Sequence, residues 1–353
     1  MGPHDGIPPL LDGTRLPELD EILEGAVVVA QPMHTRFRGV TIREAMLLRG
    51  PAGWAEFSPF AEYGPEESSR WLAAAIEAGW QGWPAPVRDL VPVNATVPAV
   101  AAADVGRVLD SFGDVPAVKV KVAESGRTGP EGVAEDVARV AEVRRLRPGA
   151  ALRIDANQGW DHTTALAALQ RLAEYGLEYA EQPVAGIEGL ARLREALHAA
   201  GTPMRIAADE SVRKETDPLA VARAGAADLV VVKVQPLGGV RRALGIVGAA
   251  GLDAVVSSAL DTSVGIAAGV ALAASLPALP FACGLGTVAL FTEDVVVPGW
   301  LPDAGHLASG ASGASRARPV PDPAALARLR AGEDRQQWWR QRLVQAHGVL
   351  SAT

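Results

Sequence analysis

From about residue 93 onward, short runs rich in β-branched residues alternate with alanine-rich segments of helical periodicity. This alternation is typical of parallel βαβ units, in which each helix carries the chain back to the same edge of a sheet. Eight such runs are present, and eight strands close a (β/α) barrel. The expected strands are residues 93–97, 117–122, 152–157, 177–182, 204–209, 229–235, 252–258 and 281–285.

The region before the barrel lacks this alternation. It contains candidate strands at residues 26–30 and 40–48 and a helical stretch at about 66–79. Strands followed by a helix indicate an α+β unit separate from the barrel.

The region after residue 286 also departs from the barrel pattern. Residues 307–322 are rich in Gly, Ser, Ala and Pro, which predicts an extended connection. A charged helix follows at about 323–347 and carries Trp338 and Trp339. Because two indole rings would be out of place on an isolated solvated helix, we expect this helix to pack against the first region.

Length and charge exclude several classes of protein. The 353 residues are 48% apolar, which is enough for one barrel and a smaller domain. The formal net charge is −8 and no basic block is present, so nucleic acid is not an expected partner. One cysteine, Cys283, excludes an internal disulfide, and without a leader or a long apolar run we expect a cytoplasmic protein with no membrane contact.

Ionisable side chains interrupt five of the expected barrel strands near their C-terminal ends. Parallel strands are buried on both faces, so a charge there is costly unless it is paired or bound to a metal. The C-terminal rim is also where barrel enzymes build their sites. The ionisable interruptions are Lys119 and Lys121, then Arg153 and Asp155, then Glu181, then Asp209 and Glu210, and finally Lys233, and the polar Asn157 shares a face with Asp155.

Three of these carboxylates come from successive strands. Asp155, Glu181 and Asp209 are separated by 26 and 28 residues, about one βα unit each, so we expect them to converge. Their mutual repulsion predicts a divalent cation, and a hard oxygen donor set suits Mg²⁺ or Mn²⁺. Asp209 and Glu210 point to opposite sides of the strand, and periodicity alone leaves open which of them is the ligand.

Two lysines flank the expected metal ligands. Lys121 lies on the second barrel strand and Lys233 on the sixth, so they face each other across the barrel mouth. A lysine near a cation and a second ammonium group loses its proton more readily and can act as a base. This arrangement suits abstraction of a proton next to a carboxylate, with the positive charges stabilising the enolate.

These motifs resemble those of a known enzyme family. Lys119-Val120-Lys121, Asp155-Ala156-Asn157, Glu181-Gln182-Pro183, Asp209-Glu210 and Lys233 with Gly238-Gly239 resemble the muconate-lactonizing branch of the enolase superfamily. Residues 35–44, 53–60, 93–98 and 282–287 are similar to the o-succinylbenzoate synthase family within that branch.

The resemblance implies an architecture and a reaction. It implies a modified (β/α)7β TIM-type barrel with an α+β capping domain that the C-terminal segment completes, with boundaries 1–92, 93–286 and 287–353. The implied cofactor is Mg²⁺, with Mn²⁺ as a substitute. The implied enzyme is a lyase of menaquinone biosynthesis. Its implied substrate is a small carboxylate, a succinyl-cyclohexadiene carboxylate, which undergoes α-proton abstraction and syn dehydration to o-succinylbenzoate.

The resemblance also assigns expected roles to residues. Lys121 would be base and acid, Lys233 would face the enolate, and Lys119 would support Lys121. The expected substrate-binding residues are Arg153, Asn157, Ser257, Ser258, Gly284, Leu285, Phe37 and Phe57.

Two other functions remain open at this point. An N-acylamino acid racemase, or a related epimerase, would share the first half-reaction and use both lysines as bases. Dipeptide epimerases usually carry an Asp-x-Asp row on the last strand, which residues 283–285 lack. A non-catalytic binding barrel would be expected to lose a ligand or a lysine, and all five positions are present. The oligomeric state is also open.

Overall fold

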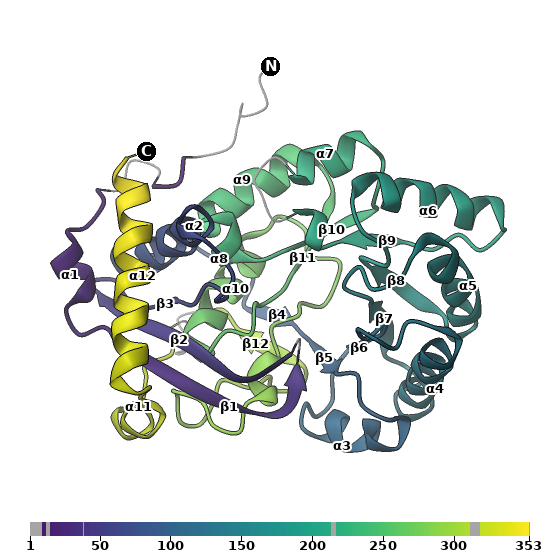
Figure 1. Cartoon of the computed structure of the whole chain (residues 1–353), viewed down its shortest axis with the longest axis horizontal. Coiled ribbons are helices and arrows are strands. Elements are labelled where there is room, and N and C mark those ends of the chain that lie inside the picture. Colours follow the sequence, from purple (N-terminus) through teal and green to yellow (C-terminus); the bar gives the residue numbers. More distant parts are fainter. Residues whose placement is uncertain (1–8, 12–14, 38, 213–216, 311–317, 353) are drawn as a thin grey trace.

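A curved sheet of seven parallel strands forms the centre of the computed structural model, which describes residues 9–11, 15–37, 39–212, 217–310 and 318–352 (Figure 1). The strands follow the order β11-β10-β9-β8-β7-β6-β5, so neighbours in sequence are neighbours in space. They are β5 (Asn94–Val97), β6 (Ala117–Lys121), β7 (Ala151–Asp155), β8 (Leu177–Glu181), β9 (Ile206–Ala208), β10 (Leu229–Val232) and β11 (Asp253–Val256).

The expected eighth strand, residues 281–285, is reduced to two isolated bridges that close the barrel. Cys283 pairs in parallel with Val93 on one side, and Gly284 pairs with Ser257 on the other. The backbone N–H of Asn94 donates to the carbonyl oxygen of Cys283 at 2.9 Å. A regular ladder does not form because a proline stands at position 280 and Gly284 interrupts the segment.

Helices cover the outer face of the barrel, as the periodicity predicts. On α4, Val133, Val140 and Val143 are buried, whereas Val137 is only partly so. The helices after β5 are α3 (Val105–Asp110), α4 (Pro130–Leu146), α5 (His162–Leu172), α6 (Ile187–Ala199), α7 (Asp217–Arg223), α8 (Val234–Leu237), α9 (Val240–Ala250) and α10 (Ser263–Ser275).

The cap is an antiparallel sheet with helices on it. Its strands run in the order β1 (Val27–Phe37), β2 (Val40–Gly50), β3 (Gly53–Phe57). The cap also contains α1 (Leu19–Leu23) and α2 (Pro65–Ile76), and α2 continues into a π-helical turn at Glu77–Gln81. The fold class expected from the sequence is therefore confirmed, while the domain boundaries at residues 92 and 286 stay predictions.

The end of the chain returns to the cap. The single helix expected at 323–347 is two helices, α11 (Pro323–Leu329) and the long α12 (Glu333–Ser351) (Figure 1), because the backbone leaves the helical conformation at Arg330 and resumes it only after Gly332. Trp339 is buried, stacks edge-on against Phe57 at 5.9 Å between ring centroids, and donates its indole N–H to Glu44 at 2.8 Å. The predicted packing of the last helix on the first region is confirmed.

A short two-stranded sheet joins the two ends of the barrel region. In it, β4 (Leu90–Pro92) pairs antiparallel with β12 (His306–Ala308). Part of the extended connection expected at 307–322, residues 311–317, lies outside the described residues. Within the described ranges, each helix is too short or too polar to cross a lipid bilayer.

One buried carboxylate ties the cap to the barrel. Glu56 of β3 accepts hydrogen bonds from the backbone N–H groups of Thr262 and Gly265, at 3.0 and 3.1 Å, at the start of α10. The Ser58 hydroxyl donates to its other oxygen at 2.6 Å. Burial, helped by the charge of Asp261, raises the pKa of Glu56. The loop that follows Glu56 is thereby held over the barrel mouth.

Candidate active site

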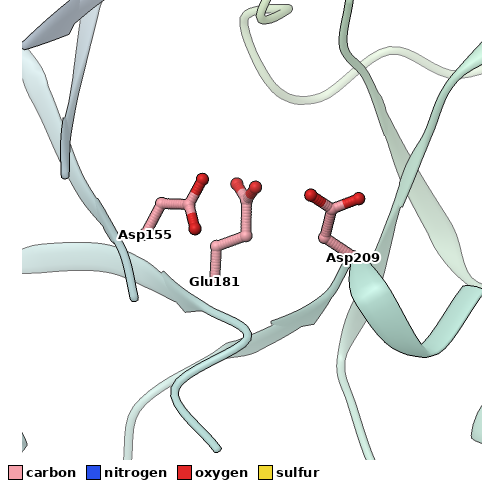
Figure 2. A group of neighbouring side chains, drawn as sticks. All are labelled: Asp155, Glu181 and Asp209. Atoms are coloured by element: carbon pink, nitrogen blue, oxygen red, sulfur yellow. The ribbon is translucent and has the colours of Figure 1, made fainter. Parts of the chain in front are cut away.

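Three buried carboxylates meet at the C-terminal rim of the barrel. Asp155 ends β7, Glu181 ends β8, and Asp209 directly follows β9. The parallel register places Asp155 beside Glu181. Each of the three offers an oxygen, and these oxygens all lie within 4.8 Å of one another (Figure 2). The structure thus brings together the three carboxylates that the strand spacing singles out.

The cluster fits a divalent metal ion. Burial raises the pKa of Glu181, and the neighbouring Asp155 carboxylate raises it further, because like charges in a dry site disfavour ionisation. A set of buried carboxylate oxygens matches the preference of hard divalent cations, whose charge would remove this repulsion. Asp155, Glu181 and Asp209 can therefore hold such an ion.

Glu210, which periodicity could not separate from Asp209, lies outside this cluster. Its carboxylate accepts a hydrogen bond from the Asn157 side-chain amide at 3.0 Å. Glu210 thus contacts Asn157, and the carboxylate group that could hold a metal contains Asp209 instead.

Three lysines surround the carboxylates. The Nζ of Lys119 lies 3.0 Å from Glu181 and 3.3 Å from Asp155. Lys121, two residues farther along β6 and on the same face, pairs with Asp155 and donates to the Asn157 side-chain oxygen at 2.8 Å. Lys233 pairs with Asp209. Lys121 and Lys233 therefore contact opposite ends of the triad.

The position of Lys233 differs slightly from expectation. The sequence predicts a strand through residue 235, but β10 ends at Val232 and Lys233 is the residue before the short helix α8. Its backbone is still extended, so its side chain continues the inward alternation of the strand.

Lys119 is held in its charged form. Burial disfavours the ammonium ion, but the charges of Glu181 and Asp155 outweigh it and raise the pKa of Lys119 above its ordinary value. A lysine whose pKa is raised suits electrostatic support better than proton abstraction.

A small cavity, here called the central chamber, lies over the triad. Its volume is about 30 Å³, and it shares lining residues with two larger cavities of about 990 and 230 Å³. We call the larger one the outer cavity and the other the side cavity. The central chamber is lined by Phe60, Thr96, Lys119, Lys121, Asp155, Asp209, Lys233, Ser257, Ser258, Ala259, Leu260, Gly284 and Thr287.

Several expected substrate-binding residues do line these cavities. Ser257, Ser258 and Gly284 line the central chamber, and Asn157 lines the outer cavity beside Lys121. The Ser258 hydroxyl lies 2.6 Å from that of Thr287. Ser257 and Ser258 follow β11 directly, which is why they reach the rim.

Other expected residues do not reach the site. Phe57 is fully buried in the cap core against Trp339, because residue 57 still belongs to β3 and points away from the barrel. Leu285 is fully buried and faces Gly269 of α10, on the outer side of the barrel wall. The structure does not bring these two side chains to the cavities described above, and the side chain of Phe37 lies outside the described residues.

Arg153 also lies away from the cavities. It shares a face with Asp155 but sits one layer deeper, where it donates to Asn94 at 3.2 Å and to the carbonyl oxygen of Ala282 at 2.6 Å. Its guanidinium carbon lies 4.9 Å from the ring centroid of Tyr179. Arg153 fills the barrel interior, so the structure does not bring it to the cavities where a substrate would lie.

Sequence reasoning missed five residues that line the central chamber, which are Phe60, Thr96, Ala259, Leu260 and Thr287. Thr96 lies two residues after Asn94 on β5, so the two side chains share a face of the strand. This two-residue period could have indicated that the side chain of Thr96 points inward. Phe60 belongs to the same cap motif as Phe57, but only the docking of the cap shows which aromatic ring reaches the barrel.

Comparisons with known proteins agree with this geometry. Residues 100–315 match the family described as "Enolase C-terminal domain-like", and residues 28–79 match "Enolase N-terminal domain-like". The solved muconate lactonizing enzyme of Pseudomonas fluorescens, complexed with muconolactone, shares the fold, with a TM-score of 0.70 and 22% identity over 87% of this chain and 98% of that one.

Curated relatives are closer in sequence. The o-succinylbenzoate synthase of Mycolicibacterium smegmatis is 50% identical over 95% of this chain and 99% of its own length. That of Thermobifida fusca is 56% identical over 79% of this chain and 85% of its own length. A carboxylate triad flanked by lysines, on a capped barrel with relatives of this identity, has one reading: the chain belongs to the o-succinylbenzoate synthase family of the enolase superfamily.

Proposed function

We propose that this chain is an o-succinylbenzoate synthase, a lyase that dehydrates a succinyl-cyclohexadiene carboxylate to o-succinylbenzoate in menaquinone biosynthesis. The family relationship supports this activity. The observation that carries it is the placement of Lys121 and Lys233 at opposite ends of one buried carboxylate triad, where both line the central chamber.

The proposed cofactor is Mg²⁺, which Mn²⁺ can replace. Asp155, Glu181 and Asp209 would hold it, because they are the cluster of buried carboxylates at the barrel rim. When bound, the cation supplies positive charge that offsets the charge developing on the substrate carboxylate.

Lys121 is the proposed base and acid. Its Nζ contacts Asp155 and Asn157, which orient it toward the chamber. It takes the proton from the carbon next to the substrate carboxylate, and the electron pair of that C–H bond enters the ring system. The same Nζ then returns the proton to the β-hydroxyl, which leaves as water, so that the ring becomes aromatic and one face of the substrate is used.

Lys233 has a different proposed role. Its ammonium group stabilises the enolate from the other side of the chamber without exchanging a proton. Lys119, kept charged by Glu181 and Asp155, orients Glu181 and adds to the positive field around Lys121. Ser257, Ser258 and Gly284 form the wall against which the ring rests.

A second candidate function is N-acylamino acid racemisation. It is favoured by one observation, the approach of both lysines to the same chamber, since a racemase needs a base on each face of the α-carbon. Both reactions share the first proton abstraction, so the two candidates differ in what Lys233 does afterward.

The test measures both reactions on the purified enzyme with Mg²⁺. We expect the enzyme to dehydrate the cyclohexadiene substrate, which is monitored by the absorbance of the aromatic product. We expect little exchange of the α-hydrogen of an N-acylamino acid in D₂O. Rapid exchange in both enantiomers, with negligible dehydration, would overturn the synthase assignment in favour of the racemase.

A further inference from the structure

The side cavity contains an arginine that the proposed mechanism does not use. This cavity of about 230 Å³ lies between helix α2 of the cap and the barrel rim, and it reaches Asp209 and Lys233. Arg70 of α2 lines it and is half-buried. The side cavity therefore shares Phe60, Asp209, Lys233 and Ala259 as lining residues with the chamber in which the reaction is proposed to occur.

Arg70 differs from the other cations around the site in its partners. Lys119, Lys121 and Lys233 each form an ion pair with a carboxylate of the triad. The side chain of Arg70 forms no ion pair or hydrogen bond within the part of the chain that the structure describes. A half-buried guanidinium without a carboxylate partner is costly, and an anionic ligand would relieve that cost.

The walls of the side cavity suit a short carbon chain. Phe60, Trp71 and Leu237 provide apolar surface between Lys233 and Arg70. An acyl chain that enters from the chamber would bury its methylene groups on these walls before its end reaches the guanidinium. The arginine fork matches a carboxylate at that end, because it can donate two parallel N–H bonds.

Two acidic residues, Glu67 and Asp217, also line the side cavity. Glu67 is exposed and accepts the backbone N–H of Gly64 at 3.3 Å, so water screens its charge. Asp217 begins helix α7 and already interacts with a group other than Arg70. Arg70 thus remains the cation of the side cavity that is available to an anion.

We propose that Arg70 binds the terminal carboxylate of the succinyl chain and so determines specificity for a dianionic substrate. This inference rests on the proposed synthase function, since that substrate carries a second carboxylate at the end of a two-carbon chain. The first carboxylate lies at the triad, and the second extends past Phe60 into the side cavity.

The experiment compares two ligands that differ in the terminal group. Calorimetric titration with Mg²⁺ present measures binding of the product o-succinylbenzoate and of 2-butanoylbenzoate, in which a methyl group replaces the terminal carboxylate. Wild-type enzyme should prefer o-succinylbenzoate. Arg70→Met should weaken its binding at least about tenfold and leave 2-butanoylbenzoate nearly unchanged, while Arg70→Lys should keep part of the preference.

The control variant is Arg107→Met, which removes an exposed cation on α3 that pairs with Asp104. It should keep the full preference. If Arg70→Met keeps the preference, or weakens both ligands equally at unchanged melting temperature, the assignment of Arg70 is overturned. A wild-type enzyme that fails to dehydrate the cyclohexadiene would instead refute the proposed function, since the binding preference is measured independently of turnover.

Discussion

The guanidinium of Arg43 lies over the ring of Phe60, with 4.5 Å between its carbon and the ring centroid. Arg43 is buried in β2 and also donates to the carbonyl oxygens of Leu260 at 3.2 Å and Ala259 at 3.3 Å. One cap arginine thus holds both the barrel loop after β11 and the aromatic ring that lines all three cavities.

From this relationship we predict that Phe60→Ala lowers kcat/KM for dehydration by about ten- to a hundredfold, because the substrate loses an apolar wall and water enters the chamber. The matched control is Phe57→Ala in the cap core. It should cost about 3 kcal/mol or more of unfolding free energy but leave kcat/KM of the folded enzyme nearly unchanged. Steady-state kinetics and denaturant melts distinguish the two, and unchanged kcat/KM in Phe60→Ala would contradict the prediction.

The metal assignment predicts that Asp155→Asn, Glu181→Gln and Asp209→Asn each weaken Mg²⁺ binding at least about a hundredfold, because each removes a negative oxygen ligand. Each of these variants should also lose dehydration activity, because the reaction requires the bound metal. Calorimetric titration with Mg²⁺, and with Mn²⁺ as a second ion, measures the affinity. Glu210→Gln is the control and should keep the metal, since Glu210 bonds to Asn157. Metal loss in Glu210→Gln with retention in Asp209→Asn would reverse the ligand choice.

The unequal roles of the two lysines predict unequal tolerance of arginine. Lys233→Arg keeps a positive charge and should retain about a tenth to a hundredth of kcat, whereas Lys121→Arg removes the base and should lose at least about 10⁴-fold. Rates of dehydration measured for both variants, with Mg²⁺ affinity as a check on folding, test this. Equal inactivation of both would show that Lys233 also exchanges a proton.

The burial of Glu56 predicts a pH dependence of stability. Its pKa is raised above the ordinary 4.5, so the folded state binds the proton more tightly than the unfolded state. The stabilisation is fully present below about pH 4.5 and is lost as the pH rises through the folded-state pKa, with a slope of up to about 1.4 kcal/mol per pH unit.

Glu56→Gln stays neutral at every pH and should flatten this decline in the melting temperature. Asp261→Asn should flatten it partly, because the pKa of Asp261 is also raised by burial and its charge acts on Glu56. Melting curves recorded between pH 5 and 8 measure the slope, and a slope that persists unchanged in Glu56→Gln would remove Glu56 as its source.

Much of the fold and of the triad can be predicted because it depends on local periodicity. The alternation of apolar strand runs and helical segments identifies the barrel strands, since each strand must be buried on both faces. The spacing of Asp155, Glu181 and Asp209 matches one βα unit, and parallel strands end at the same rim. The side chains of the triad therefore converge whatever the details of packing.

Periodicity gives the face of a side chain but not its depth. Arg153 and Asp155 share one face of β7, yet Arg153 fills the barrel interior whereas Asp155 joins the triad at the rim. The choice between Asp209 and Glu210 likewise needed the position at which β9 ends.

What only the tertiary structure decided is how the cap meets the barrel. The sequence by itself determined a barrel with a carboxylate triad and flanking lysines, because these follow from burial and strand order, and the resemblance to the family implied that the separate α+β unit is a cap. It could not determine that Phe60 lines the cavities while Phe57 packs on Trp339, or that Arg70 lines the side cavity. Those contacts depend on residues that are distant in sequence. Glu56 of the cap binds the start of α10, and Arg43 of the cap binds the loop after β11. The geometry of these contacts depends on how the surface of the cap packs on the surface of the barrel. Such packing produces no periodic pattern in the sequence.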